Sequence, residues 1–394
     1  MTARPLDGVR VLDFTIAQQG PHATTLLALM GAEVVRIERT GARVGGYGTR
    51  PRDHHMVGYF AHSLGKESVA IDVRRPEGRE IAQKLARDVN AVTSNFRPGV
   101  MERLGLGFEE LRADNPRLVY VTGSGWGREG TIAQRPSIDM VAQGAGGMTW
   151  MSGYEDGPPA LASCALADHT GALTFCTAVL AALVQAQRTG VGTHIDTSLY
   201  GGQSALQAWE MNASSLAGGL PRSARSHSIL RSRGAVWRAF ETSDGWLTIA
   251  VEDSGAFERL CTAVGEPELA GQYADDGTRA AHIDAIEEAV ERRIATASTA
   301  HWLDRLRAHR VPSGPVSSFV DVLADSQANA NGYIGRIEHP EFGDIEIAGL
   351  PITFDREPIP PAPPPLTGAD TEHCLADLGY APPEIEELRA QGMI

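Results

Sequence analysis

Asp168 is the one acid in a small, apolar stretch, residues 160–171, immediately before an Ala/Leu-rich pattern that predicts a helix from Ala172 to Gln187. Aspartate is a favoured N-cap residue, so one interpretation is a helix cap. The other is a nucleophile, because a carboxylate at the positive end of a helix dipole stays ionised at neutral pH even when it is partly buried. The local sequence leaves both interpretations open.

Arginines form the second feature that could do chemistry. Five of them crowd the segment at and after the end of one predicted strand, and two more follow another: Arg36, Arg39, Arg43, Arg50 and Arg52, then Arg97 and Arg103. A solvated surface with scattered ion pairs would explain them. A phosphate site would explain them as well, because the guanidinium group presents a fork of donors that matches phosphate oxygens.

Other common catalytic patterns find little support. No Gly-x-Gly-x-x-Gly follows the first predicted strand, and in the segment 123–127 the serine stands one place early for a serine-hydrolase nucleophile elbow.

His54 and His55 are adjacent and would face opposite ways in a strand, and no spacing resembles a metalloenzyme site, so no metal is expected. His169 is interpreted as packing rather than as an acid or base. The glycine-rich segments 123–127 and 144–147 are candidate donors to an oxyanion.

Composition narrows the function classes. A net charge of -14 argues against a general nucleic-acid surface. The four cysteines are far apart, which suggests neither a disulfide framework nor a zinc site and favours a reduced, cytoplasmic compartment. No apolar leader is expected at the N-terminus, and no run of residues is expected to reach the ~20 apolar residues of a membrane span.

Hydrophobic periodicity predicts an α/β fold. Strands and helices alternate over the first 122 residues: strand 9–14, helix 21–30, strand 33–38, strand 69–73, helix 76–89, strand 91–96, helical turns 100–104 and 108–114, and strand 118–122. Such alternation predicts a parallel, doubly wound sheet, and ligands of these sheets bind beyond the carboxyl ends of the strands. A strand at 194–199 and a helix at 200–216 follow.

A different pattern begins near Val236 and predicts a small α+β domain with a strand at 246–251 and helices at 256–264, 282–297 and 301–310. Short strands at 335–339 and 345–347, a proline-rich stretch and a closing helix at 383–390 complete the chain. The expected organisation is therefore a first domain over 1–225, the small domain over 226–330, and a C-terminal segment over 331–394.

Several segments, taken in order, resemble the family III CoA-transferases, which include formyl-CoA and carnitine CoA-transferases and the related α-methylacyl-CoA racemases. The segments that carry the resemblance are 6–13, 31–38, 65–72, 95–99, 103–107, 115–118, 141–143, Ala167-Asp168, 188–192, 312–316 and Leu378-Gly379. They span nearly the whole chain, and it is their number and order that make the resemblance specific.

The resemblance implies that the first domain, over 1–225, is a large Rossmann-like domain to which the segment over 331–394 returns. It further implies a homodimer of two interlinked subunits, substrates that are an acyl-CoA and a free carboxylic acid, and Asp168 as the nucleophile. It also implies contacts to coenzyme A from seven residues: Gln18, Arg39, Arg74, Asn95, Phe96, Arg97 and Arg103. Three of these belong to the arginine group found above from strand ends alone.

The racemase branch of the family is the main alternative. The racemases of the family have a Gly-His-Asp motif, and the matching segment of this chain reads Ser137-Ile138-Asp139. Isoleucine cannot transfer a proton, so chemistry with two bases is not supported and CoA transfer is the preferred function. A non-catalytic acyl-CoA-binding protein with the same fold is the alternative from another functional class.

Overall fold

The structure is a computed structural model that describes residues 4–41, 57–153, 157–220, 222, 226–340 and 342–394. Contacts within it divide the chain into two compact units. The first comprises residues 1–146, 164–206 and 323–394, and the second comprises 147–163 and 207–322. The predicted domain boundaries at 225/226 and 330/331 stay a prediction.

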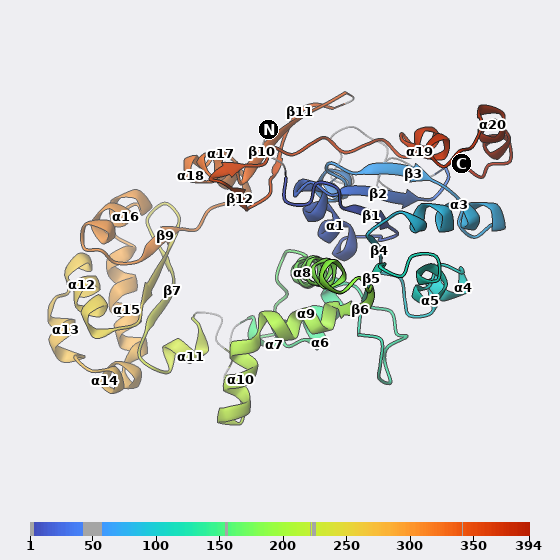
Figure 1. The fold of residues 1–394 in the computed structure, drawn as a ribbon. Coiled ribbons are helices and arrows are strands. Elements are labelled where there is room, and N and C mark those ends of the chain that lie inside the picture. Colours follow the sequence, from blue (N-terminus) through green and yellow to red (C-terminus); the bar gives the residue numbers. More distant parts are fainter. Residues whose placement is uncertain (1–3, 42–56, 154–156, 221, 223–225, 341) are drawn as a thin grey trace. The chain divides into compact units, whose positions relative to one another are not determined.

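A six-stranded parallel sheet is the centre of the first unit (Figure 1). Its strand order is β3-β2-β1-β4-β5-β6, and every neighbouring pair is parallel. The strands are β1 (Arg10–Asp13), β2 (Glu33–Glu38), β3 (Glu67–Ala70), β4 (Ala91–Ser94), β5 (Val119–Ser124) and β6 (Thr193–Ser198). The predicted parallel α/β fold is confirmed.

Alternating side chains bury the two faces of this sheet under separate helical layers. Val11 belongs to a cluster with α1 (Gln19–Leu29) and α8 (Leu166–Thr189), and Leu12 belongs to a cluster on the opposite face. The helices of that second cluster are α3 (Pro76–Arg87), α4 (Val100–Arg103), α5 (Phe108–Arg112), α19 (Thr371–Asp377) and α20 (Pro382–Ala390). Helices on both faces are what a doubly wound sheet requires.

The remaining elements of the first unit are short. They are α2 (Val57–His62), α6 (Asp139–Ala145), α9 (Leu199–Leu206), α18 (Ser326–Ala330), β10 (Ile334–His339), β11 (Gly343–Ala348), β12 (Thr353–Phe354) and β13 (Glu357–Pro358), with α17 (Phe319–Ala324) across the division between the units. Ile337 of β10 and Ile347 of β11 pack in the same cluster as α1 and α8. The chain's last segment therefore completes the core that its first segment begins.

The second unit is built on a three-stranded antiparallel sheet, β7-β8-β9. Its elements are α7 (Met148–Met151), α10 (Ala208–Ala217), α11 (Ser228–Arg231), β7 (Val236–Glu241), β8 (Trp246–Val251), α12 (Ser254–Val264), α13 (Glu268–Gln272), α14 (Asp276–Ala281), α15 (Ile283–Ile294), α16 (Thr299–Ala308) and β9 (Ser313–Pro315). The sequence analysis missed β7 and β9, whose partners lie on β8.

Two predicted elements are corrected by the structure. β3 begins at Glu67 rather than Val69, because Glu67 and Ser68 already pair with β2, and on the outer edge Asp370 and Thr371 accept hydrogen bonds from Ser68 N and Ala70 N. The single helix predicted over 200–216 is two helices, α9 and α10, which are separated at Gln207.

α8 also overturns an expectation about membranes. This helix is long and apolar enough to cross a bilayer by length and composition, whereas no such run was expected. In the structure it packs against α1, α9 and β5, and a single helix of this kind is a weak indication of a membrane span.

Candidate active site

The loop between β1 and α1 is held by a buried network around Asp13. The Asp13 carboxylate accepts hydrogen bonds from Thr15, Thr24 and Thr93, and Lys66 Nζ lies 3.1 Å from its Oδ2. Burial alone would raise the pKa of Asp13, but Lys66 and the threonine hydroxyls hold it below the ordinary value. The network fixes the loop at the carboxyl end of β1, where a doubly wound sheet places its ligands.

Asp168 is the third residue of α8, in the helix's first turn. At 100° per residue it lies on the same side of the helix as the buried Phe175, Val179 and Ala186, so its carboxylate is half-buried rather than turned to solvent. Ala165 is the N-cap, and the interpretation of Asp168 as the cap is therefore wrong. The helix starts six residues earlier than Ala172, the predicted first residue.

Burial and, to a smaller extent, the charge of Asp139 together raise the pKa of Asp168 to about 6. The sequence analysis expected the helix dipole to keep this carboxylate ionised; desolvation and a like charge act against the dipole. At pH 7 a group with a pKa of about 6 is ionised in roughly ten molecules for each protonated one. Asp168 can therefore still act as a nucleophile at neutral pH.

Gln19 is a polar residue near this site that sequence reasoning missed. Its side chain is 3% exposed, and its Nε2 is a buried donor with no hydrogen-bond partner among the residues that the structure describes. A Cβ atom on Gly123, at the end of β5, would lie 2.7 Å from Gln19 Oε1, and one on Gly171 of α8 would lie 3.0 Å from Nε2. Only the absence of side chains at these two glycines leaves room for the amide.

Three histidines gather where α1, α2 and α8 meet. The rings of His22 and His169 are 4.8 Å apart, those of His22 and His62 are 5.5 Å apart, and those of His62 and His169 are 6.2 Å apart. Burial lowers the pKa of His22 to about 4 and that of His62 to about 3, so both are neutral at pH 7. His169 thus packs against other rings, as the sequence analysis expected.

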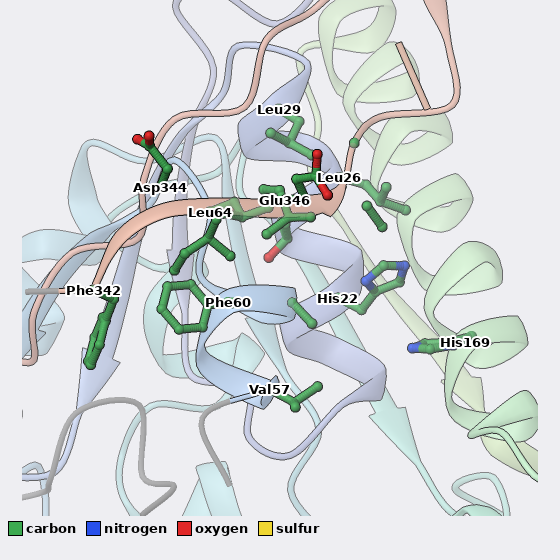
Figure 2. Close-up of a pocket in the computed structure, with 16 residues that line it drawn as sticks. His22, Leu26, Leu29, Val57, Phe60, Leu64, His169, Phe342, Asp344 and Glu346 are labelled. Atoms are coloured by element: carbon green, nitrogen blue, oxygen red, sulfur yellow. The ribbon is translucent and has the colours of Figure 1, made fainter. Parts of the chain in front are cut away.

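A cavity of about 820 Å³ opens beside these histidines (Figure 2). His22 and His169 border it at one end, and Figure 2 shows His169 projecting from α8 toward His22 on α1. Most of the wall is apolar and comes from α1, α2 and β11, with Phe60 and Phe342 as its largest side chains. Asp168 does not line this cavity although the next residue, His169, does, because successive residues of a helix point about 100° apart.

The residues predicted to contact coenzyme A follow the carboxyl ends of adjacent strands. Arg39 follows β2 and is exposed, and Arg74 follows β3. Arg74 makes a bidentate ion pair with Asp72, at 2.8 Å from Nε and 2.7 Å from Nη2, and Arg39 is close enough to lower the pKa of Asp72 as well. Gln18 is the half-buried residue before α1.

The other predicted contacts follow β4. Asn95 Oδ1 accepts a hydrogen bond from Ile16 N at 2.8 Å, and its Nδ2 donates to Ile16 O at 2.7 Å, so this side chain fixes the loop after β1. Phe96 and Arg97 border a small pocket with side chains of β5 and β6, and Arg103 lies exposed at the end of α4. The arginines Arg43, Arg50 and Arg52 and the pair His54-His55 lie outside the described residues.

Two of the glycine-segment amides considered as oxyanion donors are already engaged. Gly127 N donates to Ser124 Oγ at 2.9 Å, and Gly146 N donates to Ala142 O at 2.8 Å. Among the described residues, no group of three or more histidine, cysteine, aspartate or glutamate side chains could hold a metal ion.

Comparison with known proteins agrees with this arrangement. Residues 6–371 match the family described as CoA-transferase family III. The chain is 31% identical to the succinyl-CoA:glutarate CoA-transferase of Mus musculus, over 99% of this chain and 90% of that protein. It is 33% identical to the succinyl-CoA:mesaconate CoA-transferase of Haloarcula hispanica, over 95% and 96% of the two chains.

Solved structures show the same fold. A CaiB/BaiF family protein from Brucella suis superimposes with a TM-score of 0.82 at 28% identity, and the match covers 96% of this chain and all of that one. The resemblance inferred from the ordered motifs is confirmed. The chain belongs to CoA-transferase family III, and its activity is the transfer of coenzyme A.

Proposed function

We propose that the chain transfers coenzyme A from an acyl-CoA to a free carboxylic acid through covalent intermediates on Asp168. The observation that carries this proposal is the Asp168 carboxylate itself. It is half-buried in the first turn of α8, and burial and the neighbouring Asp139 raise its pKa to about 6, near neutrality. A carboxylate of this basicity is both ionised at pH 7 and more nucleophilic than an ordinary aspartate.

The first half-reaction has two steps. An Asp168 carboxylate oxygen attacks the thioester carbonyl, the carbon–sulfur bond breaks, and coenzyme A leaves as the thiolate with an acyl-aspartyl anhydride left on the enzyme. The thiolate then attacks the Asp168 carbonyl carbon, which releases the first acid as a carboxylate and leaves an aspartyl-CoA thioester. The second acid reverses both steps, and charge balances because one anion leaves as another enters.

The strand-end residues would hold coenzyme A during these steps. We assign its phosphates to Arg39, Arg97 and Arg103, because an exposed guanidinium group donates well to phosphate oxygens. Gln18, Arg74, Asn95 and Phe96 are the further contacts, although Asn95 and Arg74 also have partners in the protein. The names of the relatives suggest a dicarboxylic acyl donor such as succinyl-CoA.

The protein would act as a cytoplasmic homodimer of interlinked subunits, with no nucleic-acid or membrane partner. Several large apolar side chains of the first unit are exposed in the single chain, including Leu173 and Val184 of α8 at 57% and 54%. A second subunit would cover such surface. Sedimentation at micromolar concentration tests this assignment, and a monomer would contradict it.

Mass spectrometry tests the chemistry directly. The protein is incubated with a panel of acyl-CoAs that begins with succinyl-CoA, and we expect an adduct on Asp168 that disappears when a free acid is added. Asp168→Ala should bind coenzyme A but lose turnover by more than about a hundredfold. Tight binding with no adduct would instead identify a non-catalytic acyl-CoA-binding protein.

A further inference from the structure

The carboxylate of Asp139 is held by contacts to both of its oxygens at the start of α8. Its Oδ1 accepts hydrogen bonds from the backbone N–H groups of Ala167 at 2.7 Å and of Asp168 at 3.1 Å. Its Oδ2 accepts one from Gln143 Nε2 at 2.6 Å, and that nitrogen also donates to Cys164 O at 3.1 Å. Gln143 is 1% exposed, so this arrangement has little freedom to move.

These contacts replace a cap that the helix itself does not provide. The first N–H groups of a helix have no partner within it, and the N-cap residue here, Ala165, has no side-chain acceptor. Asp139 satisfies two of those groups from 28 and 29 residues upstream, and one of them belongs to Asp168. Apolar packing holds the same two helices together: Ala142 of α6 and Ala167 of α8 share a small core cluster with Leu199 of α9.

The same carboxylate places a negative charge beside Asp168. Like charges in a partly dry site repel, so the ionised resting form of Asp168 is destabilised relative to any form in which its charge is gone. Acylation of Asp168 removes that charge, because the carboxylate becomes an anhydride or a thioester. The repulsion is therefore present in the free enzyme and absent in the covalent intermediates.

We propose that Asp139 is a positioning residue for Asp168: it fixes the backbone of the nucleophile and, through its charge, destabilises the nucleophile's ionised form. The catalytic part rests on the proposed function, in which Asp168 is acylated. The electrostatic part does not, since it concerns only the titration of Asp168 in the free protein.

The elements that pack against α8 also carry titratable groups. α6 contributes Asp139, and α8 itself contributes His169, which is in ring contact with His22 of α1. The other elements contribute Tyr120 on β5, His194 and Asp196 on β6, and Tyr200 on α9. Burial raises the pKa of Tyr120 and lowers that of His194. His169 adjoins Asp168 in the chain, so its titration is the first that must be separated from that of Asp168.

The titration is measured without substrate. Unfolding is followed from about pH 4.5 to 8 for the full chain and for Asp168→Asn, and the difference between the two, plotted against pH, reports the pKa of Asp168. Both unfolding series are then repeated with Asp139→Asn added to each protein. In this background the amide oxygen still accepts from the two N–H groups, but the charge is absent. We expect the midpoint to fall by at least about 0.3 pH unit. An unchanged or higher midpoint would overturn the electrostatic part.

Two control backgrounds sharpen this result. In His169→Gln the shift caused by Asp139→Asn should persist, and its disappearance would assign the effect to the histidine. Asp275 caps α14 in the second unit by accepting from Thr278 N at 2.9 Å, and Asp275→Asn should leave the midpoint where it is. A shift of equal size in Asp275→Asn would show a general response to lost charge and overturn the proposal.

Catalysis tests the positioning part. If Asp168 is acylated, Asp139→Ala should lower kcat by at least about tenfold with KM changed by less than about threefold, because the nucleophile is misplaced while the binding residues remain. Asp139→Asn should retain more of kcat than Asp139→Ala, and its acidic limb should move to lower pH with the midpoint measured above. Should Asp139→Ala fail to fold, Gln143→Leu releases Oδ2 and should lower kcat in the same way.

Wild-type kcat in both Asp139→Ala and Gln143→Leu would overturn the positioning role. A protein with no transferase activity at all would instead contradict the proposed function, and the substrate-free titration would still decide the electrostatic part.

Discussion

Lys66 and Asp13 form an ion pair with no solvent-exposed side-chain surface, in which Nζ lies 3.1 Å from Oδ2. Lys66 also donates to Thr24 Oγ1 at 2.7 Å and to Pro21 O at 2.9 Å. The pair thereby joins the end of β1 to the first turns of α1, and it sets the loop that carries Gln18 and Gln19. Burial lowers the pKa of Lys66 to about 8 in spite of its partner.

Breaking this pair should be costly. Lys66→Met leaves the Asp13 carboxylate buried without a counter-charge, and we expect a loss of about 3–5 kcal/mol in the free energy of unfolding. Urea denaturation at pH 7 measures it. The double variant Asp13→Asn/Lys66→Met should recover part of the loss, since it removes the stranded charge. A single variant that loses less than about 1 kcal/mol would contradict this view of the pair.

Removing the Asp168 charge should stabilise the folded protein at neutral pH. The folded-state pKa of about 6 lies above the ordinary value of 3.8, so the ionised group costs stability above pH 6, and this cost vanishes as the pH falls below 3.8. We therefore expect Asp168→Asn to raise the free energy of unfolding by at most ~3 kcal/mol at pH 7.5, with the gain shrinking between pH 6 and 4. Chemical denaturation across this range tests the prediction, and a destabilised variant at pH 7.5 would refute it.

Arg39 and Arg103 should each contribute to the affinity for coenzyme A. Replacing either with alanine should weaken binding by roughly 1.5–3 kcal/mol, the range for a hydrogen bond to a charged group, and the effect should shrink in high salt. Calorimetric titration with coenzyme A and with 3′-dephospho-CoA shows which phosphate each arginine holds. Arg307→Ala, in an exposed pair with Asp304, is the matched control. Affinities that do not change for either ligand would return these arginines to the solvated-surface interpretation.

Transfer should proceed without exchange at the α-carbon. Ile138 stands at the position that is histidine in the Gly-His-Asp motif of the racemases. It is 65% exposed and has no group that can carry a proton. A chiral 2-methylacyl-CoA incubated with the enzyme in deuterated water should therefore keep its α-hydrogen while coenzyme A is transferred. Deuterium incorporation at a rate comparable with transfer, detected by mass spectrometry, would restore the racemase alternative.

The class of fold could be predicted from the sequence, and so could a family whose members transfer coenzyme A. Val11 and Leu12 are adjacent and pack on opposite faces of the sheet, because side chains in a strand alternate with a period of two residues. Helices such as α3 show apolar residues three and four positions apart. Such signals are local and can be read without a structure. The ordered motifs added the family and, by resemblance, the identity of Asp168 as the candidate nucleophile.

The meeting of groups far apart in the chain could not be read from the sequence. Asp139 caps α8 from 28 residues away, Lys66 pairs with Asp13 across 53 residues, and Asp370 completes the edge of β3 from 302 residues away. No periodicity encodes these choices, because a buried polar group takes whichever partner the packing brings within hydrogen-bond distance. The pKa of Asp168 follows from the same packing, which is why a local argument from the helix dipole did not foresee its rise.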